Sequence, residues 1–302
     1  MKIYINRRPK LGPWGGGIKT VNKLVNKLIQ EGHSVCYKLE NNVDVIFCID
    51  PRPNEYGEWY QNFIDYRNVN PGTKIIQRVG DLGTHSKPEL TKLVAQTLQI
   101  SDFMIFPSEW SRDWIGFKGD NCEVVHNAPM SIFYENRQVN LTTSVKPKLV
   151  THHWSMNPKK GFHFYQFLQE HIDRTSEFDF KYIGRLPDEI NIKNKTDPIA
   201  ASALSIELPK NDIYITASIE EAGANHVVEA LGCGLPVVYH EAGGSIDDYC
   251  KNYGESFETF ENMLESIRLV VASYSTYKNK ALSYNRNNDD VVLKYLEMIN
   301  NV

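Results

Sequence analysis

Residues 218–238 read SIEEAGANHVVEALGCGLPVV and carry the strongest structural signal in the chain. Apolar runs flank this stretch at 213–217 and 235–239, and both are typical of buried strands. Residues 218–224 are therefore expected in a loop at the carboxyl end of a strand. Asn225 can cap a short helix over residues 225–231. A strand, a loop, a helix and a second strand in this order predict a parallel sheet with helices packed against it.

Two carboxylates stand out within this stretch. Glu221 is expected in the loop, and Glu229 is expected in the first turn of the helix, near its positive end. A carboxylate accepts paired hydrogen bonds, for example from hydroxyl groups. The two side chains could therefore face one hydroxyl-rich ligand across the junction of loop and helix.

The same alternation of apolar runs and amphipathic stretches extends over the whole chain. Strands are expected at residues 1–5, 35–37, 43–49, 74–79, 103–107, 123–125, 148–152 and 178–183, besides the two named above. Further helices are expected at residues 18–30, 88–98, 110–114, 161–171, 260–274 and 291–299. A polar segment without periodicity, residues 136–148, separates two such series. This pattern predicts an α/β chain with two doubly wound, Rossmann-like domains that face a central cleft, where ligands bind at the carboxyl ends of the strands.

Composition excludes several classes of protein. The 302 residues are 41% hydrophobic and carry a net charge of −4, which excludes extensive disorder and argues against a nucleic-acid partner. No apolar run approaches the roughly 20 residues of a membrane span, and no apolar stretch follows the basic start as in a secretion signal. The 5 cysteines form no CxxC pair. We therefore expect a cytoplasmic chain without a disulfide framework or zinc site.

A glycine-rich turn, GPWGGG at residues 12–17, precedes the first helix. It fits neither a dinucleotide fingerprint, because Thr20 stands at the third glycine position, nor a P-loop, because Ile18 stands where lysine is needed. Consecutive glycines still let backbone amides face an anion at a helix start. Gly16 and Gly17 are therefore candidates for ligand contact, and a tight turn without a ligand is the alternative.

The stretch at 218–238 resembles the E-x7-E region of retaining glycosyltransferases with the GT-B fold, of the family 4 (group 1) kind. Glu221 and Glu229 occupy the two glutamate positions. The resemblance implies that Glu229 holds the ribose of a nucleotide sugar and that Glu221 lies at the donor sugar. Further donor-binding candidates in the same stretch are Gly223, Ala224, Asn225 and His226. The sequence departs from the family pattern at Ala222 and Ala224, where glycines are usual.

A second resemblance lies at residues 151–161, THHWSMNPKKG, which are similar to the G-R-x4-K-G loop of the same family. Lys160 matches the family lysine, and the resemblance implies that it neutralises the diphosphate leaving group. Ser155 stands where the family has arginine, so this candidate donor-binding position lacks the charge. Arg185, at the end of the next strand, is the candidate that replaces it. A solvated turn is the alternative for the lysines.

Weaker similarities add further candidates. Gly243 and Gly244 resemble the family's G-G-x-x-E turn, with Asp247 in place of the glutamate, and suggest close approach to the donor. Asp81 and His85 leave a strand near the place where relatives have a histidine that contacts the donor sugar. Both pairs have a structural alternative, a plain turn for the glycines and helix capping for Asp81 and His85.

The resemblance implies a retaining transfer of a hexosyl group from a UDP- or GDP-linked sugar to an acceptor hydroxyl, in glycan or polysaccharide synthesis. Residues 1–143, with a last helix at about 284–302 crossing back, would form the acceptor domain, and residues 144–283 the donor domain. The nucleotide sugar is the co-substrate; no other cofactor and no metal are expected, since no D-x-D pair is evident. The acceptor could be a glycan, a lipid-linked sugar or a small molecule, and peripheral membrane contact stays open. The alternatives are a GT-B nucleotide-sugar epimerase and a non-catalytic sugar-nucleotide-binding protein.

Overall fold

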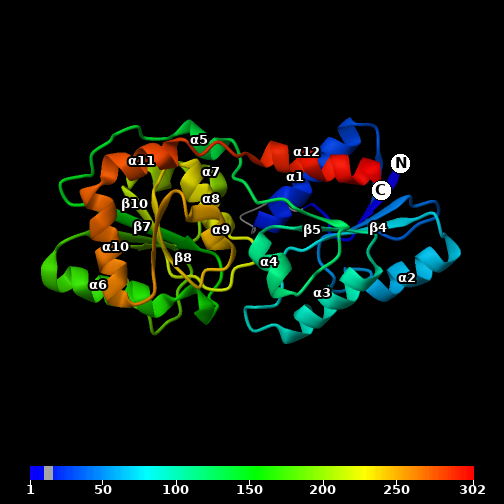
Figure 1. Cartoon of the computed structure of the whole chain (residues 1–302), viewed down its shortest axis with the longest axis horizontal. Coiled ribbons are helices and arrows are strands. Elements are labelled where there is room, and N and C mark those ends of the chain that lie inside the picture. Colours follow the sequence, from blue (N-terminus) through cyan, green and yellow to red (C-terminus); the bar gives the residue numbers. More distant parts are fainter. Residues whose placement is uncertain (10–15) are drawn as a thin grey trace. The chain divides into compact units, whose positions relative to one another are not determined.

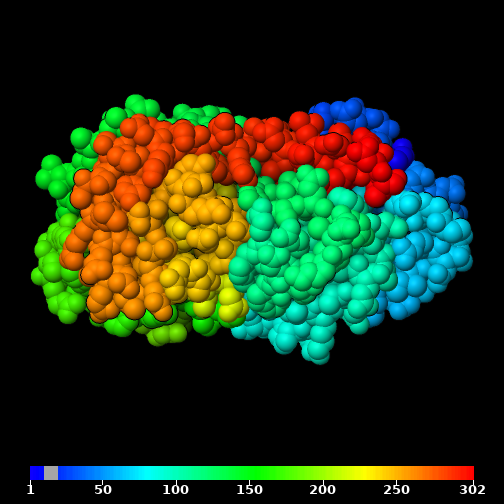
Figure 2. Space-filling model, viewed as in Figure 1, coloured from blue at the N-terminus to red at the C-terminus, as the bar shows by residue number. Residues whose placement is uncertain are grey.

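Four apolar side chains repeat at helical spacing near the start of the chain, and all four are buried in the first long helix. They are Val21, Leu24, Val25 and Leu28 of α1 (Gly16–Gln30). The computed structural model, shown in Figure 1, describes residues 1–9 and 16–302. At the other end of the chain, α12 (Asn288–Asn301) buries Val292, Tyr295 and Ile299 and packs against α1. Figures 1 and 2 show the red α12 beside the blue α1, so both ends of the chain belong to one unit.

This first unit comprises Met1–Asn127 and Asn288–Val302 and is built on a six-stranded parallel sheet in the order β2-β1-β3-β4-β5-β6. The strands are β1 (Lys2–Ile5), β2 (Ser34–Cys36), β3 (Val45–Cys48), β4 (Lys74–Arg78), β5 (Phe103–Phe106) and β6 (Cys122–Val124). Its other helices are α2 (Tyr60–Val69), α3 (Pro88–Ile100) and α4 (Glu109–Trp114).

The second unit, Ala128–Asn287, is built on another six-stranded parallel sheet, in the order β12-β11-β10-β7-β8-β9. The strands are β7 (Lys148–His153), β8 (Asp179–Gly184), β9 (Lys195–Thr196), β10 (Ile213–Thr216), β11 (Val237–His240) and β12 (Gly254–Phe257). Its helices are α5 (Ile132–Glu135), α6 (Phe162–Thr175), α7 (Ala201–Glu207), α8 (Asn225–Gly232), α9 (Ser245–Cys250), α10 (Phe260–Ala272) and α11 (Tyr274–Leu282), with 3-10 turns at Pro158–Lys160 and Leu208–Lys210.

The predicted α/β class and its two parallel sheets are confirmed, and every strand and helix expected from the sequence occurs in order. The boundary between the units lies after Asn127, earlier than the expected one at residue 143. The reason is that the polar segment belongs to the second unit: Phe133 is buried in its core, and the guanidinium of Arg137 donates to the carbonyl oxygens of Gly232 and Leu282.

Several elements were not predicted. They are α2, α5, α7, α9, α11, β9 and β12. Each gives a weak apolar pattern: α2 fully buries only Phe63, and β12 only Phe257. Among the described residues, no helix combines the length and apolar character of a membrane span.

Candidate active site

Three loops of the second unit are joined at the carboxyl edge of its sheet. They follow β7, β10 and β11, which are neighbours in the sheet. The amide of Ile219 donates to the carbonyl oxygen of Lys159 at 2.9 Å, and the amide of Glu221 donates to that of Gly243 at 3.1 Å. The amide of Ser245 in turn donates to the carbonyl oxygen of Glu221 at 2.9 Å. These backbone bonds hold the candidate residues of the three loops in one place.

Two lysine–glutamate pairs cross between the first two of these loops. The ammonium of Lys160 is bonded to the Glu221 carboxylate, and Nζ of Lys159 lies 2.5 Å from Oε2 of Glu220. The Lys160–Glu221 pair is the more enclosed, with side chains only 11% and 14% exposed, against 30% and 36% for the other. Lys160 and Glu221, both predicted from the sequence, are therefore in contact, and both follow the ends of strands as expected.

Local backbone geometry fixes Lys160. The 3-10 turn Pro158–Lys160 is capped by Asn157, whose side-chain oxygen accepts from the Lys159 amide at 3.0 Å. Gly161 follows with a φ of 72°, and a side chain there would collide with the carbonyl oxygen of Ala217. Opposite, Glu220 also has a positive φ, 53°, which is uncommon for a residue with a side chain. Both loops therefore hold unusual backbone conformations where their charges meet.

Glu229 is buried on α8, but not where the sequence predicted. The N-cap of α8 is Ala224, so Glu229 falls in the second turn and not in the first. Asn225 does not cap the helix; its side-chain amide donates to the carbonyl oxygen of Gly223 at 3.3 Å. The amide of Ala224 instead donates to Oγ of Ser245 at 3.0 Å. The helix therefore has no side-chain cap, and Ser245, the first residue of α9, instead holds the residue that precedes α8.

A histidine that the sequence analysis did not select holds Glu229. Nε2 of His152, at the end of β7, lies 3.0 Å from Oε2 of Glu229, and Nδ1 lies 3.1 Å from the hydroxyl of Tyr214. His152 and Glu229 are 9% and 7% exposed. The signal was present in the sequence, since a polar residue at the carboxyl end of a buried strand lies at the ligand-binding edge of such a sheet.

His226, a predicted donor-binding residue, is enclosed by the same cluster. Its Nε2 lies 3.0 Å from Oγ1 of Thr216, and its ring centroid lies 5.1 Å from that of His153. Burial lowers the pKa of His226 to about 3. The imidazole is therefore neutral at physiological pH and acts as a packed hydrogen-bonding group, not as a cation for a diphosphate.

Arg185 and Ser155 have more local roles in the structure. The guanidinium carbon of Arg185 lies 4.2 Å from the ring centroid of Trp154, and the side chain is exposed. The hydroxyl of Ser155 accepts from the Asn157 amide at 3.1 Å, which shapes the turn that leads to Lys160. Replacement of the family arginine by Arg185 therefore stays a prediction.

The glycine pair after β11 adjoins Glu221. Gly244 has a φ of 69°, and a side chain on Gly243 would come within 2.8 Å of Cβ of Ile246. Asp247 accepts a hydrogen bond from the hydroxyl of Tyr239 at 3.0 Å. The glycines are thus needed for the turn itself, and their contact with a donor stays a prediction.

Solved structures of glycosyltransferases share this architecture. The chain is similar over 99% of its length to 98% of sucrose-phosphate synthase from Thermosynechococcus elongatus, with 11% identity and a TM-score of 0.71. It matches HepE of Anabaena in complex with UDP and glucose with 13% identity and a TM-score of 0.70, over 100% and 99% of the two chains. WaaG, a glycosyltransferase involved in lipopolysaccharide biosynthesis, matches with 12% identity and a TM-score of 0.67, over 99% of both chains. The chain has the GT-B fold.

Identities this low establish the fold and leave membership of family 4 a prediction. No protein-family model matches the sequence, and no curated protein sequence matches it. The residue roles within the GT-B fold are therefore argued from this chain's own geometry.

The remaining predicted residues lie in the first GT-B unit. Asp81 is occupied within its own loop, since Oδ1 accepts from the Gly83 amide at 2.9 Å and Oδ2 lies 2.7 Å from Nζ of Lys87. Asp81 therefore has partners within its own loop but does not cap α3, whose N-cap is Lys87 without a side-chain cap, and its catalytic role stays a prediction. His85 is half-buried in the same loop. Gly16 and Gly17 begin α1, whereas residues 12–15 of the glycine-rich turn lie outside the described residues.

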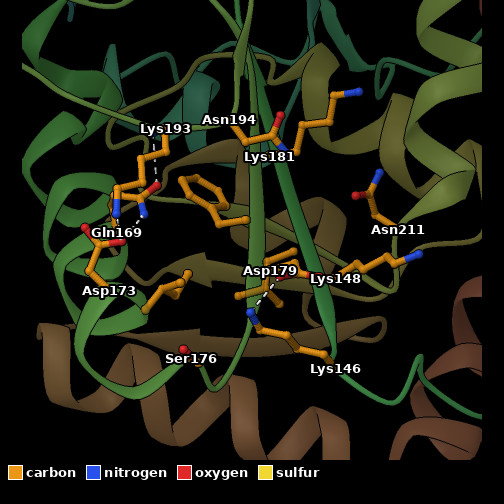
Figure 3. A pocket seen from close by; sticks show the side chains of 13 residues that line it. Lys146, Lys148, Gln169, Asp173, Ser176, Asp179, Lys181, Lys193, Asn194 and Asn211 are labelled. Atoms are coloured by element: carbon orange, nitrogen blue, oxygen red, sulfur yellow. Dashed lines mark hydrogen bonds and ion pairs between the residues drawn. The ribbon is translucent and has the colours of Figure 1, made fainter.

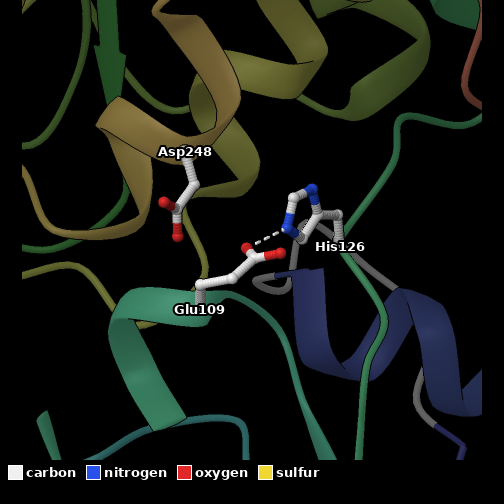
Figure 4. Close-up of side chains that lie close together, drawn as sticks. All are labelled: Glu109, His126 and Asp248. Atoms are coloured by element: carbon white, nitrogen blue, oxygen red, sulfur yellow. Dashed lines mark hydrogen bonds and ion pairs between the residues drawn. The ribbon is translucent and has the colours of Figure 1, made fainter. Parts of the chain in front are cut away.

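Two further features lie outside this site. In the first unit, Nε2 of His126 lies 2.5 Å from Oε2 of Glu109, so the two side chains are partners (Figure 4). In the second unit, a cavity of about 480 Å³ opens at the amino ends of β7 and β8 (Figure 3). Nζ of Lys146 lies 2.8 Å from Oδ1 of Asp179 on its rim. This cavity lies at the opposite end of the strands from the candidate active site and contains none of its residues.

Proposed function

We propose that this chain is a glycosyltransferase that moves a hexosyl group from a UDP- or GDP-linked sugar to an acceptor hydroxyl, with retention of configuration. The observation that carries the proposal is the enclosed Lys160–Glu221 pair on joined loops of one GT-B unit, together with the buried Glu229 of α8 in the same unit. A cation for phosphates and two carboxylates for hydroxyls are the groups that a nucleotide sugar requires. The solved structure of HepE, which shares the fold, holds UDP and glucose.

The proposed roles follow from charge and burial. Negative charge grows on the diphosphate as the glycosidic bond breaks, and the ammonium of Lys160 would stabilise it in a site that excludes water. When the diphosphate replaces Glu221 as the partner of the Lys160 ammonium, the Glu221 carboxylate becomes available to accept hydrogen bonds from the donor sugar. Glu229, held by His152, would accept hydrogen bonds from the ribose. Arg185 would add a second cation, and no metal ion takes part, so activity should persist in a chelator.

A screen of UDP-, GDP- and ADP-linked sugars tests this function. A true donor should raise the unfolding temperature of the chain by mass action and should be consumed when a glycan, a lipid-linked sugar or a small-molecule acceptor is supplied. NMR of the product then reports the anomeric configuration. Epimerised donor in the absence of an acceptor would favour the epimerase alternative. Binding without turnover would favour the non-catalytic one, and no stabilisation by any nucleotide sugar would contradict the donor site.

A further inference from the structure

A lysine is buried without a direct ion pair on the second unit, at the end of the sheet remote from the candidate active site. Lys278 lies on α11 and is 1% exposed. Among residues 1–9 and 16–302, its ammonium makes no ion pair and no hydrogen bond. Burial lowers the pKa of Lys278 to about 8, although the nearby Asp212 carboxylate raises it. A buried ammonium without a direct ion pair is costly to the fold unless an anion binds to it.

Lys278 lines a cavity of about 410 Å³ that opens at the starts of β7 and β10. The cavity wall is polar, and three consecutive residues, Thr142, Thr143 and Ser144, contribute hydroxyl groups to it. The side-chain amide of Asn140 adds a hydrogen-bond donor, whereas that of Asn211 already donates to the carbonyl oxygens of Glu207 and Leu208. A ligand here would therefore meet the ammonium of Lys278, several hydroxyls and an amide.

The charges around the cavity favour an anion. Asp212 is the buried carboxylate of the wall, and it already accepts from the Lys148 amide at 2.8 Å and from the Ser144 amide at 3.3 Å. Lys148 reaches the same cavity, and Figure 3 shows its side chain extended towards Asn211. Arg137 adds a positive field close to Lys278, because its guanidinium is bonded to backbone carbonyl oxygens. On the wall itself, Lys148 and Lys278 outnumber the Asp212 carboxylate, because the third lysine, Lys210, is paired with Glu207.

We propose that this cavity binds a phosphate group between Lys278 and residues 142–144. A phosphate accepts more hydrogen bonds than a carboxylate, and so it can use the three hydroxyls together with the ammonium. The volume exceeds that of the phosphate alone, so a phosphorylated small molecule fits as well as inorganic phosphate. The site shares no residue with the candidate active site, and the inference does not depend on the proposed glycosyl transfer.

Thermal unfolding of the full chain with inorganic phosphate, against chloride at equal ionic strength, tests the site. Phosphate at about 100 times its dissociation constant should raise Tm by several degrees in the parent chain. Lys278→Met should remove this response. Lys210→Met is the control and should keep it, because Lys210 lies on the cavity wall but is paired with Glu207 at 2.5 Å.

A second variant keeps the test decisive if Lys278→Met fails to fold. Thr143→Val removes one hydroxyl and keeps the side-chain shape, and it should raise the phosphate midpoint by about tenfold. Glucose 6-phosphate as a second probe distinguishes a phosphate ester from inorganic phosphate as the ligand. If glucose 6-phosphate gives its half-maximal rise in Tm at a lower concentration than inorganic phosphate does, the site is assigned to a phosphate ester. No response of the parent chain, an equal response in Lys278→Met, or an equal loss of response in Lys210→Met would overturn the proposal.

Discussion

Nε2 of His152 lies 3.0 Å from Oε2 of Glu229, and this contact joins the end of β7 to the second turn of α8. The other ring nitrogen of His152 lies 3.1 Å from the hydroxyl of Tyr214 on β10. The Glu229 carboxylate is therefore oriented by two neighbouring strands of the sheet. A carboxylate fixed in this way can accept hydrogen bonds from a diol without first losing rotational freedom.

The first prediction concerns His152 as a positioning residue. His152→Phe keeps a ring beside Tyr214 but cannot bond Glu229, so affinity for the nucleotide should fall by about tenfold. Glu229→Ala should cost more, about 1.5–3 kcal/mol, or roughly 10- to 150-fold, because it removes the carboxylate itself. Calorimetry with UDP and GDP measures both. His163→Phe, on an exposed position of α6, is the control. Unchanged affinity in Glu229→Ala would contradict the ribose assignment.

The adjacent lysines supply a matched pair for the second prediction. Lys160→Met should lower kcat by about 10²- to 10³-fold, because the enclosed ammonium would stabilise charge that develops only in the transition state. Lys159→Met should change kcat only a few-fold, because the Lys159–Glu220 pair is more exposed and water screens its charges. Steady-state kinetics with the identified donor checks this. Equal losses in the two variants would show that net charge on the loop matters and that the position of Lys160 does not.

The sequence could predict this site only in part. Alternating apolar runs were enough for the two sheets, because strands buried on both faces need continuous apolar segments. Lys160, Glu221 and Glu229 were selected because the stretches that contain them resemble glycosyltransferase motifs, which no pattern of apolar residues alone would show. The contact that holds the start of α8 could not be predicted, since Ser245 begins another helix, α9, and reaches Ala224 only in the folded unit. The His152–Glu229 contact likewise depends on which strands are neighbours, and sequence order does not give that.

The third prediction tests how the backbone positions Lys160. Gly161 and Gly116 both have a φ of 72°, but a Cβ at Gly116 meets nothing within 4 Å, whereas one at Gly161 collides with the Ala217 carbonyl oxygen. Gly116→Ala should therefore cost only the conformational strain, about 1–2 kcal/mol of unfolding free energy. Gly161→Ala should cost more and should also lower kcat, since the turn that carries Lys160 must move. Urea denaturation and kinetics measure the two effects. Similar stability losses in the two variants, without any change in kcat, would show that the turn at Gly161 does not position Lys160 for catalysis.

The last prediction follows from the lowered pKa of Lys278. The unfolded chain should hold this proton up to about pH 10.5, whereas the folded chain releases it near pH 8. Between these values the unfolded state binds more protons, so this group makes the folded state more stable as pH rises, by up to about 1.4 kcal/mol per pH unit. Lys278→Met should be more stable than the parent at pH 8 and below, and its advantage should shrink towards pH 10.5.

The neighbours of Lys278 make this difference interpretable. Besides burial, the Asp212 carboxylate raises the pKa of Lys278 and the Arg137 guanidinium lowers it, and both neighbours are present in the variant as in the parent. The thiol of Cys233 stays neutral because burial raises its pKa, so the variant and the parent differ mainly in one titration. Urea denaturation of both chains at several pH values between 8 and 10.5 gives the curve. Saturating phosphate should flatten the difference, because a bound anion restores the charged form of Lys278 in the folded state. A stability difference that is constant with pH would show that the ammonium is solvated, and the phosphate site would then lose its physical basis.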